Sequence, residues 1–237
     1  MPQGLHTISI IPARGGSKRL PGKNLLPLQG RSLLAWSITQ SMATPGILRH
    51  IVSTDDAAIA EEARANGAEV IERPAELATD TAGTLGVCQQ VVKEVEKEGK
   101  RVDVIVLLQP TSPFRKQRDI EDALKKLQEN EASAVIGVSH AKLGPKWLLQ
   151  ETESGLQFAF ANTFDSIRTQ DQPALYQPNG YLYIYRRDTL MTAEGYAWGE
   201  KALPHLVEAP FDLDIDTEND YLIAKAIANG YPYDWHA

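Results

Sequence analysis

The sequence of 237 residues lacks several features that would define a function class. Its single cysteine, Cys88, cannot form an internal disulfide, and a reducing, cytoplasmic location is expected. Lysine and arginine number 24 against 31 acidic residues, and the net charge of -7 argues against a broad nucleic-acid-binding surface. No run of about 18 apolar residues occurs, and the first residues lack the features of a signal peptide. Neither a membrane span nor secretion is therefore expected.

The order of the predicted elements indicates the fold class. Over about the first 140 residues, short β-branched runs alternate with segments of helical period, which is typical of βαβ units in a mostly parallel sheet. The predicted strands are Thr7–Ile11, His50–Ser53, Glu69–Glu72, Val102–Leu108 and Ala134–Val138, and the predicted helices are Leu33–Ala43, Ala57–Asn66, Thr84–Glu98 and Asp119–Gln128. We therefore predict an α/β fold. Cys88 falls on the apolar face of its helix and is interpreted as a core residue.

The alternation changes after about residue 140. The predicted elements there are a hairpin formed by Trp147–Gln150 and Leu156–Phe160, strands over Tyr181–Tyr185 and Pro210–Ile215, and a helix over Glu218–Ala228. A hairpin that emerges late from a parallel sheet is a plausible contact with a second copy of the chain. We predict one domain over residues 1–237, with a dimerisation arm inserted over approximately 140–180.

A basic loop follows the first predicted strand. The segment Ala13–Asn24 contains Arg14, Lys18, Arg19 and Lys23 and has no acidic residue, although the whole chain is acidic. Its glycines let the backbone approach a ligand, and loops at the carboxyl ends of parallel strands are where α/β sheets bind ligands. The spacing matches neither a P-loop nor a dinucleotide-binding motif. We interpret the loop as a binding site for a phosphate chain, with a solvated surface loop as the alternative.

Near the carboxyl end of the chain, three aspartates occupy every second position and alternate with apolar residues. On a strand, Asp212, Asp214 and Asp216 would share one face at intervals of about 6.6 Å. Carboxylates held together in this way suit Mg²⁺ bound jointly with a substrate phosphate. An EF-hand is excluded, because Thr217 stands where glycine is needed and Ile223 where a bidentate glutamate is needed. The alternative is that Asp216 or Thr217 only caps the following helix.

Two turns carry further polar groups. After a buried strand, Gln109 directly precedes Pro110, and Thr111 and Ser112 lie between Pro110 and Pro113, so these three side chains are predicted to point in fixed directions. Asn179 and Gly180 precede the strand over 181–185, where the pair could equally form an ordinary turn. The alternative for the turn that contains Thr111 and Ser112 is an ordinary turn stabilised by their hydroxyl groups, without a binding role. The histidines show no metal-ligand spacing, so no zinc site is predicted.

Together these motifs resemble the acylneuraminate cytidylyltransferases, which activate nonulosonic acids with CTP. The resemblance covers essentially the whole chain. It is carried by IPARGGSKRLPGKN (11–24), VSTDD (52–56), RPAELATDTAGT (73–84), LLQPTSP (107–113), PNGYLYI (178–184) and DLDIDTEND (212–220). It implies a Rossmann-like, mostly parallel sheet of the nucleotide-diphospho-sugar transferase type. It also implies transfer of a cytidylyl group from CTP to the anomeric hydroxyl of a sialic-type acid, with release of pyrophosphate.

The resemblance also assigns residues to roles. The residues expected to bind CTP are Arg14, Gly15, Lys18, Lys23, Asn24, Arg73 and Thr84. Those expected to bind the sugar acid are Gln109, Thr111, Ser112, Asn179 and Tyr183. Asp214 and Asp216 are expected to bind Mg²⁺ (or Mn²⁺). Arg14, Lys23, Gln109, Asp214 and Asp216 are the expected catalytic set, with no general base assigned. Lys146 matches a position from which a dimer partner reaches the sugar site. The family often has arginine directly before the glutamine of this segment, whereas here Arg168 stands one position earlier, so it either substitutes as a sugar-acid-binding residue or has another role. Tyr196 lies where the family carries an aromatic wall for the sugar.

The sequence also bears on the identity of the acceptor and on three other functions. N-acetylneuraminate is the expected acceptor and legionaminate the main alternative, whereas Asn179-Gly180 argues mildly against pseudaminate. A CMP-Kdo synthetase would have a different loop after the first strand. A haloacid-dehalogenase-type phosphatase would need Thr or Val where Asp216 or Glu218 stands. A non-catalytic nucleotide-binding module would not need the pair Asp214 and Asp216. The expected partners are CTP, a nonulosonic acid and a second copy of the chain, without nucleic acid or membrane.

Overall fold

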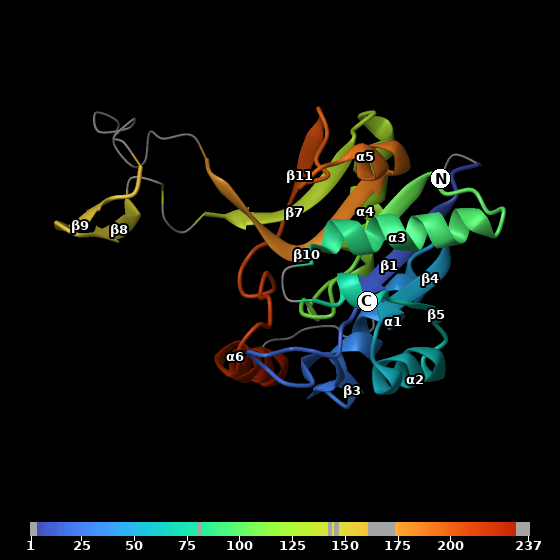
Figure 1. Cartoon of the computed structure of the whole chain (residues 1–237), viewed down its shortest axis with the longest axis horizontal. Helices are drawn as coiled ribbons and strands as arrows, with labels where there is room; N and C mark the ends of the chain where they lie inside the picture. Colours follow the sequence, from blue (N-terminus) through green and yellow to red (C-terminus); the bar gives the residue numbers. More distant parts are fainter. Residues whose placement is uncertain (1–3, 80–81, 142–143, 145–146, 161–173, 231–237) are drawn as a thin grey trace.

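A seven-stranded sheet forms the centre of the protein (Figure 1). The computed structural model describes residues 4–79, 82–141, 144, 147–160 and 174–230. The sheet has the order β11-β7-β10-β6-β1-β4-β5, with strands β1 (Thr7–Pro12), β4 (Ile47–Thr54), β5 (Glu69–Glu72), β6 (Val104–Leu107), β7 (Ala134–His140), β10 (Tyr176–Arg186) and β11 (Ala202–Leu206). Only β10 runs antiparallel to its two neighbours, and the other pairs are parallel. The predicted α/β class with a mostly parallel sheet is confirmed.

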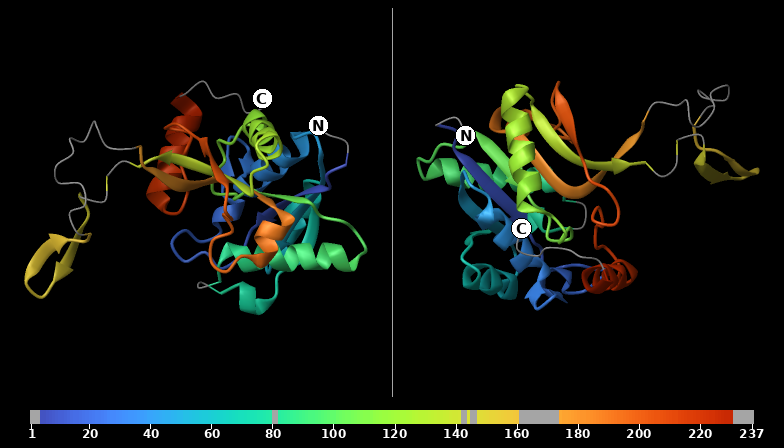
Figure 2. Two further views of the ribbon diagram at one scale, coloured as in Figure 1. Left: turned by 90° about the horizontal axis from the view of Figure 1, so that it is seen from above. Right: turned by 180° about the vertical axis from the view of Figure 1, so that it is seen from behind.

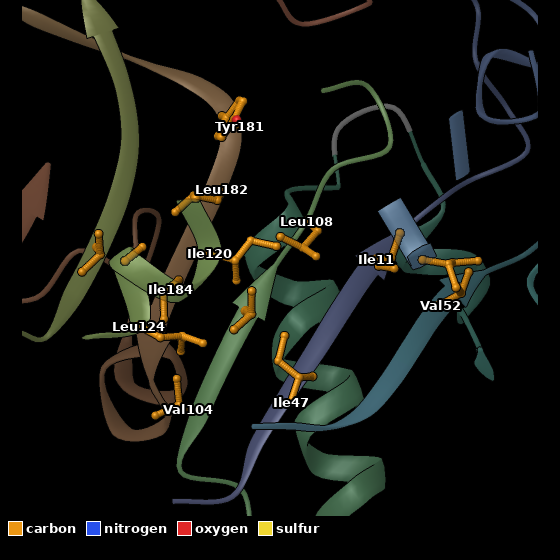
Figure 3. Packing of buried hydrophobic residues seen from close by; sticks show 14 of the residues in the cluster. Ile11, Ile47, Val52, Val104, Leu108, Ile120, Leu124, Tyr181, Leu182 and Ile184 are labelled. Carbon is orange, nitrogen blue, oxygen red and sulfur yellow. The ribbon is translucent and has the colours of Figure 1, made fainter. Parts of the chain in front are cut away.

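Helices cover both faces of this sheet. Their bounds are α1 (Leu33–Ala43), α2 (Ala57–Ala65), α3 (Thr84–Lys97), α4 (Gln117–Glu129), α5 (Arg187–Thr192) and α6 (Glu218–Gly230). Helices α1, α2 and α4 pack on one face, and α3 and α5 pack on the other. Figure 3 shows the first of these layers, with Ile120 and Leu124 of α4 against Leu182 and Ile184 of β10. Cys88 is buried in the second layer, as predicted, and burial raises the pKa of its thiol to about 12.

The strand ends place the polar loops side by side. Ile10 of β1 is in register with Leu107 of β6, and Pro12 is in register with Ser53 of β4. Three segments therefore leave the same edge of the sheet: the basic loop after β1, Asp55 and Asp56 after β4, and the turn after β6. Helix α2 begins there because the side chain of Asp56 accepts the amide of Ile59 at 3.0 Å, which caps the helix.

The prediction of a strand over Pro210–Ile215 is wrong. Residues 209–212 form a turn, and residues 213–216 are irregular and join no ladder. The amide of Ile215 instead donates to the carbonyl of Thr111 at 2.8 Å, which attaches this segment to the turn after β6. The strand of the central sheet that sequence reasoning missed is β11, which contains Pro204. Proline is tolerated there because β11 lies at the edge of the sheet.

Smaller elements complete the described chain. They are β2 (Pro27–Leu28) and β3 (Arg31–Ser32), the short helices η1 (Lys23–Leu25) and η2 (Ala75–Leu77), and the hairpin β8 (Leu149–Thr152) with β9 (Gly155–Phe158). The predicted hairpin is confirmed, and Figure 2 shows it apart from the sheet and helices in both views. Helix α6 packs beside β2 and the side chain of Trp36. Among the described residues no helix is long and apolar enough to cross a membrane.

Candidate active site

Three adjoining hollows lie at the edge where the strands end. The central cavity has a volume of about 310 Å³ and is lined by Pro12, Arg14, Lys23, Asn24, Arg73, Ala82, Thr84, Val87, Gln109, Pro110, Thr111, Asp214 and Asp216. A basic pocket of about 320 Å³ is lined by Arg14, Ser17, Lys18, Arg19, Lys23 and Asn24, and shares three of them with the central cavity. An aromatic pocket of about 530 Å³ shares Thr84 and Gln109 with the central cavity. Most residues predicted for the site are thus brought together.

The basic loop is held by contacts from neighbouring segments. The side-chain amide of Asn24, which is buried, donates to the carbonyl of Arg14 at 3.0 Å. The amide of Gly15 donates to Asp55 Oδ1 at 3.1 Å, and a Cβ atom at Gly15 would lie 2.6 Å from Asp56 Oδ2. Glycine is required here because the loop backbone approaches the start of α2 this closely. Asn24 and Gly15 therefore shape the loop.

Asp216 forms ion pairs with two basic residues of the loop. Lys23 Nζ lies 2.8 Å from Asp216 Oδ1, and Arg19 Nη2 lies 2.7 Å from Asp216 Oδ2. Burial alone would raise the pKa of Asp216, but the hydrogen bond and charge of Lys23, together with Arg19, outweigh burial and lower it. The carboxylate is thus held in its ionised form among the cations that would meet a phosphate chain.

Asp214 has a different environment. Burial, with the charge of Asp216, raises its pKa, while a hydrogen bond from the Thr111 side chain and the charge of Lys23 oppose the rise. Its Oδ1 atom is buried without a hydrogen-bond partner. An orphaned carboxylate oxygen beside a second carboxylate is suited to a hard divalent cation.

The third aspartate does not belong to this pair. Asp212 lies in the turn over 209–212 and is absent from the residues that line the central cavity. The predicted alternation on one strand face is wrong, because residues 213–216 are not a strand. Asp214 and Asp216 reach the cavity instead because the intervening Ile215 is buried and its amide is bound to Thr111. In the described part of the chain no group of three or more His, Cys, Asp or Glu side chains could hold a metal ion.

Thr217 and Asp220 cap the start of α6. The amide of Asp220 donates to Thr217 Oγ1 at 3.2 Å, and the amide of Thr217 donates to Asp220 Oδ2 at 2.8 Å. This reciprocal pair satisfies the helix start in the manner of a capping box. Of the two residues predicted as an alternative cap, Thr217 takes this role, whereas Asp216 does not, since its side chain points to Lys23 and Arg19.

Replacing Asp214 by asparagine is expected to stabilise the metal-free protein at neutral pH. A raised pKa means that the folded state binds the proton more tightly than the unfolded chain. The contribution of protonated Asp214 to the stability of the wild-type protein is therefore full below the ordinary aspartate pKa, and it is lost as pH rises through the raised pKa. Asparagine keeps an oxygen for Thr111 without a buried charge, so the melting temperature at pH 7 should rise by about 2–4 °C.

The measurement is thermal unfolding in a chelating buffer at several pH values. The gain over the wild-type protein should shrink as pH falls through the raised pKa of Asp214, and it should be gone below the ordinary aspartate pKa of about 4. Asp212→Asn, which removes a carboxylate outside the cavity, is the matched control. An unchanged or lower melting temperature for Asp214→Asn at pH 7 would contradict the destabilising effect assigned to the buried charge.

The turn after β6 supplies polar groups to the centre of the site. Gln109 lines both the central cavity and the aromatic pocket, and Thr111 lines the central cavity. Ser112 is buried, and its hydroxyl oxygen has no hydrogen-bond partner. Gly180 lies against this turn, because a Cβ atom there would be 2.8 Å from Gln109 Oε1 and 3.2 Å from Asp214 Oδ2. The glycine thus brings β10 into close approach with both side chains.

Asn179 does not line any of the three hollows. Its amide nitrogen donates to Ser139 Oγ at 2.9 Å, and its Oδ1 accepts the amide of Tyr181 at 3.1 Å. These contacts occur where the pairing of β10 with β7 is irregular, between Pro178 and Tyr183. In this structure Asn179 therefore supports the strand, and its contact with a sugar acid stays a prediction.

The remaining predicted residues have varied positions. Arg73 is only 6% exposed, and its Nη2 donates to the carbonyl of Ser53 at 2.8 Å. Burial lowers the pKa of Arg73. Thr84 is the first residue of α3 and lines two of the hollows. Lys146 and Arg168 lie outside the described residues.

Sequence reasoning missed most of the aromatic pocket. The lining is Gly83, Thr84, Leu85, Cys88, Leu107, Gln109, Pro178, Tyr183, Tyr185, Leu190, Gly195, Tyr196, Ala197 and Trp198. Tyr183 and Tyr196 were predicted from the family pattern, and the loop between α5 and β11 adds Trp198. Burial raises the pKa of Tyr183, with the backbone of Gly180 opposing the rise. The aromatic spacing of Tyr196 and Trp198 was the available signal for this loop.

Fold and site together define a nucleotide-binding transferase, in which a basic loop and a carboxylate pair converge at the strand ends of a mostly parallel sheet. Residues 8–221 match the family described as cytidylyltransferase. The chain belongs to this family of enzymes, and the resemblance stated from the motifs is confirmed.

Two relatives show the range of named activities. The CMP-N,N'-diacetyllegionaminic acid synthase of Legionella pneumophila is 30% identical over 226 residues, which are 94% of this chain and 96% of that protein. The N-acylneuraminate cytidylyltransferase of Streptococcus agalactiae is 29% identical over 220 residues, 92% of this chain and 52% of that protein. The chain thus spans about half the length of that relative.

A solved structure shares the fold. The CMP:2-keto-3-deoxy-manno-octonic acid synthetase complexed with CTP superimposes with a TM-score of 0.70 at 19% identity, over 94% of this chain and 98% of that one.

Proposed function

We propose that the protein transfers a cytidylyl group from CTP to the anomeric hydroxyl of a nonulosonic acid, releasing pyrophosphate. The observation that carries the proposal is the central cavity, where Arg14 and Lys23 face Asp214 and Asp216. The names of the relatives support the acceptor class, since they include neuraminate and legionaminate enzymes. N-acetylneuraminate is the proposed acceptor, and N,N'-diacetyllegionaminate is the alternative that the Legionella relative supports.

The three hollows suggest how the substrates would lie. The triphosphate would extend from the basic pocket into the central cavity, because their shared cations can neutralise its charge. The cytidine would lie against Arg73 and Thr84. The sugar acid would enter the aromatic pocket, with Gln109 at its junction with the central cavity. This arrangement would bring the acceptor hydroxyl close to the α-phosphate in one orientation.

Asp214 and Asp216 would hold Mg²⁺ or Mn²⁺ together with phosphate oxygens. The unpartnered Asp214 Oδ1 fits this role, and two protein carboxylates suit a cation that keeps other oxygen ligands. When bound, such a cation supplies positive charge for the α-phosphate and the leaving pyrophosphate. Arg19 and Lys23 would exchange their contacts with Asp216 for contacts with the triphosphate. Gln109 would orient the acceptor hydroxyl.

Pyrophosphate release with CTP, Mg²⁺ and a panel of sugar acids tests the proposal. The panel contains N-acetylneuraminate, N,N'-diacetyllegionaminate, pseudaminate and Kdo, and ATP replaces CTP in the control. We expect CTP-dependent release with one of the first two acids. Silence with all four acids would overturn the proposed activity, and preference for Kdo or pseudaminate would overturn the proposed acceptor.

We further propose that the hairpin of β8 and β9 binds a second copy of the chain. The pairing places Leu149 opposite Phe158, with Leu156 on the same face, and all three side chains are exposed, Leu156 to 71%. A two-stranded hairpin is marginally stable alone, and an apolar face of this kind is typical of an interface. A homodimer would cover it and could bring Lys146 and Arg168 to the partner's sugar site.

The double substitution Leu156→Glu with Phe158→Glu is expected to produce a monomer. Burying two carboxylates in an apolar interface is strongly unfavourable, so dissociation should follow at micromolar concentration. Sedimentation velocity measures the change. Leu222→Glu is the control, because Leu222 is also an exposed leucine but lies on α6 and not on the hairpin. This variant should leave the dimer intact. A wild-type protein that sediments as a monomer would contradict the dimer, and a dimeric double variant would contradict the hairpin as its interface.

A further inference from the structure

A buried arginine lies directly behind the turn that carries Gln109. The side chain of Arg115 is only 1% exposed. Its Nη2 donates to the carbonyl of Gln109 at 2.9 Å, and its Nε donates to the carbonyl of Tyr181. Its Nη1 donates to Gln40 Oε1 at 2.9 Å. One guanidinium therefore connects the turn after β6, strand β10 and helix α1.

The two carbonyls belong to segments that form the centre of the site. Gln109 lines the central cavity and the aromatic pocket, and Tyr181 follows Gly180, where an added Cβ would strike Gln109 and Asp214. Gln40 also donates to the carbonyl of Pro113 at 2.8 Å, so α1 holds the same turn at a second point. The spacing between the Gln109 turn and Gly180 thus depends on the groups that Arg115 binds.

Arginine is well suited to this connection. Its planar guanidinium offers donors in fixed directions, whereas a lysine ammonium is a compact charge on a flexible stem. Taking a cation out of water is costly, so a buried one persists where several hydrogen bonds compensate. Arg115 is also packed beside the Tyr181 ring, with its guanidinium carbon 5.7 Å from the ring centre. The geometry therefore constrains both segments more tightly than an apolar contact would.

We propose that Arg115 is a positioning residue for the acceptor step, acting through Gln109 and the Gly180 turn. This inference rests on the proposed function. Arg115 does not line the cavity, so it would not touch either substrate. It would fix the Gln109 side chain relative to Asp214, and a displacement of about 1 Å at such a point can lower a rate on the order of 10²-fold.

Arg115→Lys tests the proposal, with Arg186→Lys as the matched control. Arg186 is also partly buried and donates to two carbonyls, those of Ala132 at 2.8 Å and Leu127 at 3.3 Å, but it lines none of the three hollows. Both variants should lose stability. Gln40→Met, which removes one acceptor of Arg115 and keeps the arginine, is a milder second variant should Arg115→Lys fold poorly.

Two measurements decide the outcome. In the first, kcat/KM for the sugar acid should fall on the order of 10- to 100-fold in Arg115→Lys and less in Gln40→Met, while the Kd for CTP stays within about twofold and Arg186→Lys behaves as wild type. In the second, hydrogen exchange at the amides of Ser112 and Ile215, which bind the carbonyls of Gln109 and Thr111, should accelerate in Arg115→Lys only.

The second measurement needs no activity. If the wild-type protein is inactive with every sugar acid, the proposed function fails, whereas exchange at Ser112 and Ile215 still tests whether Arg115 positions the turn. The positioning role is overturned if exchange at these amides is the same in Arg115→Lys and Arg186→Lys. It is also overturned if exchange changes while kcat/KM for the sugar acid stays within about twofold, or if CTP binding weakens as much as turnover.

Discussion

Replacing Asp216 by alanine is expected to lower turnover on the order of 10³-fold without weakening the binding of CTP. The substitution removes one of the two carboxylates proposed for the cation, so charge on the α-phosphate and the leaving pyrophosphate would be less stabilised. The same change releases Lys23 and Arg19 from their ion pairs with Asp216. Both cations would then be available to the triphosphate.

The two effects act in opposite directions and can be measured separately. Initial rates of pyrophosphate release with saturating CTP and sugar acid report turnover. Titration with CTP in a chelating buffer reports binding, and here the variant should bind severalfold more tightly, because a negative charge that pairs with two cations of the basic loop has been removed. Binding and turnover are thus predicted to separate at one residue.

Asp212→Ala is the control for this experiment. It removes a carboxylate two residues from Asp214 that does not line the central cavity, and it should leave turnover within about threefold of wild type. Equal losses of turnover and CTP binding in Asp216→Ala, or near-normal turnover, would contradict the role assigned to Asp216. A large loss in Asp212→Ala would show that the third aspartate also contributes.

Replacing Gly180 by alanine is expected to lower turnover on the order of 10²-fold. The new methyl group would lie 2.8 Å from Gln109 Oε1 and 3.2 Å from Asp214 Oδ2, so both side chains would have to move. The backbone angle φ is 75° at this residue, a conformation that alanine adopts only with strain. Steady-state kinetics should show the loss in kcat and in kcat/KM for the sugar acid.

Gly67→Ala separates this effect from a general loss of stability. Gly67 also has a positive φ, of 86°, and an added Cβ would lie 2.9 Å from Met42 Cε; neither residue lines any of the three hollows. Both variants should melt at lower temperature, but only Gly180→Ala should lose turnover per folded molecule. Comparable kinetic losses in the two variants would show that the effect reflects instability and not the contact with Gln109 and Asp214.

The helices and most strands could be predicted from the sequence because each shows its own pattern. Helix α1 was predicted with the bounds that the structure has, and α2 and α3 each end within one residue of the prediction. Amphipathic spacing and β-branched runs determine such elements locally. The basic loop was also predictable, since its charges contrast with an acidic chain and its position after a strand fixes where it lies.

The segment around Asp214 could not be predicted in the same way. Its alternating residues have strand periodicity, but a single backbone contact from Ile215 to Thr111 and the turn before it place the aspartates. Such contacts join parts of the chain that are distant in sequence, and no local pattern reports them. For the same reason, the roles of Asn179 and Arg115 could not be predicted. The side chain of Asn179 is hydrogen-bonded to Ser139 and Tyr181, and the hydrogen-bond partners of Arg115 lie in three separate parts of the chain.

The ion pair between Lys23 and Asp216 has a consequence for the order in which the protein acquires its structure. The two residues are 193 positions apart, and the entropy of closing so long a loop must be offset by contacts that the intervening chain already makes. The sheet can therefore assemble before the basic loop meets its acidic counterpart. Until the segment leading into α6 docks against Thr111 and Trp36, the phosphate-binding half of the cavity would lack the half that carries the carboxylates.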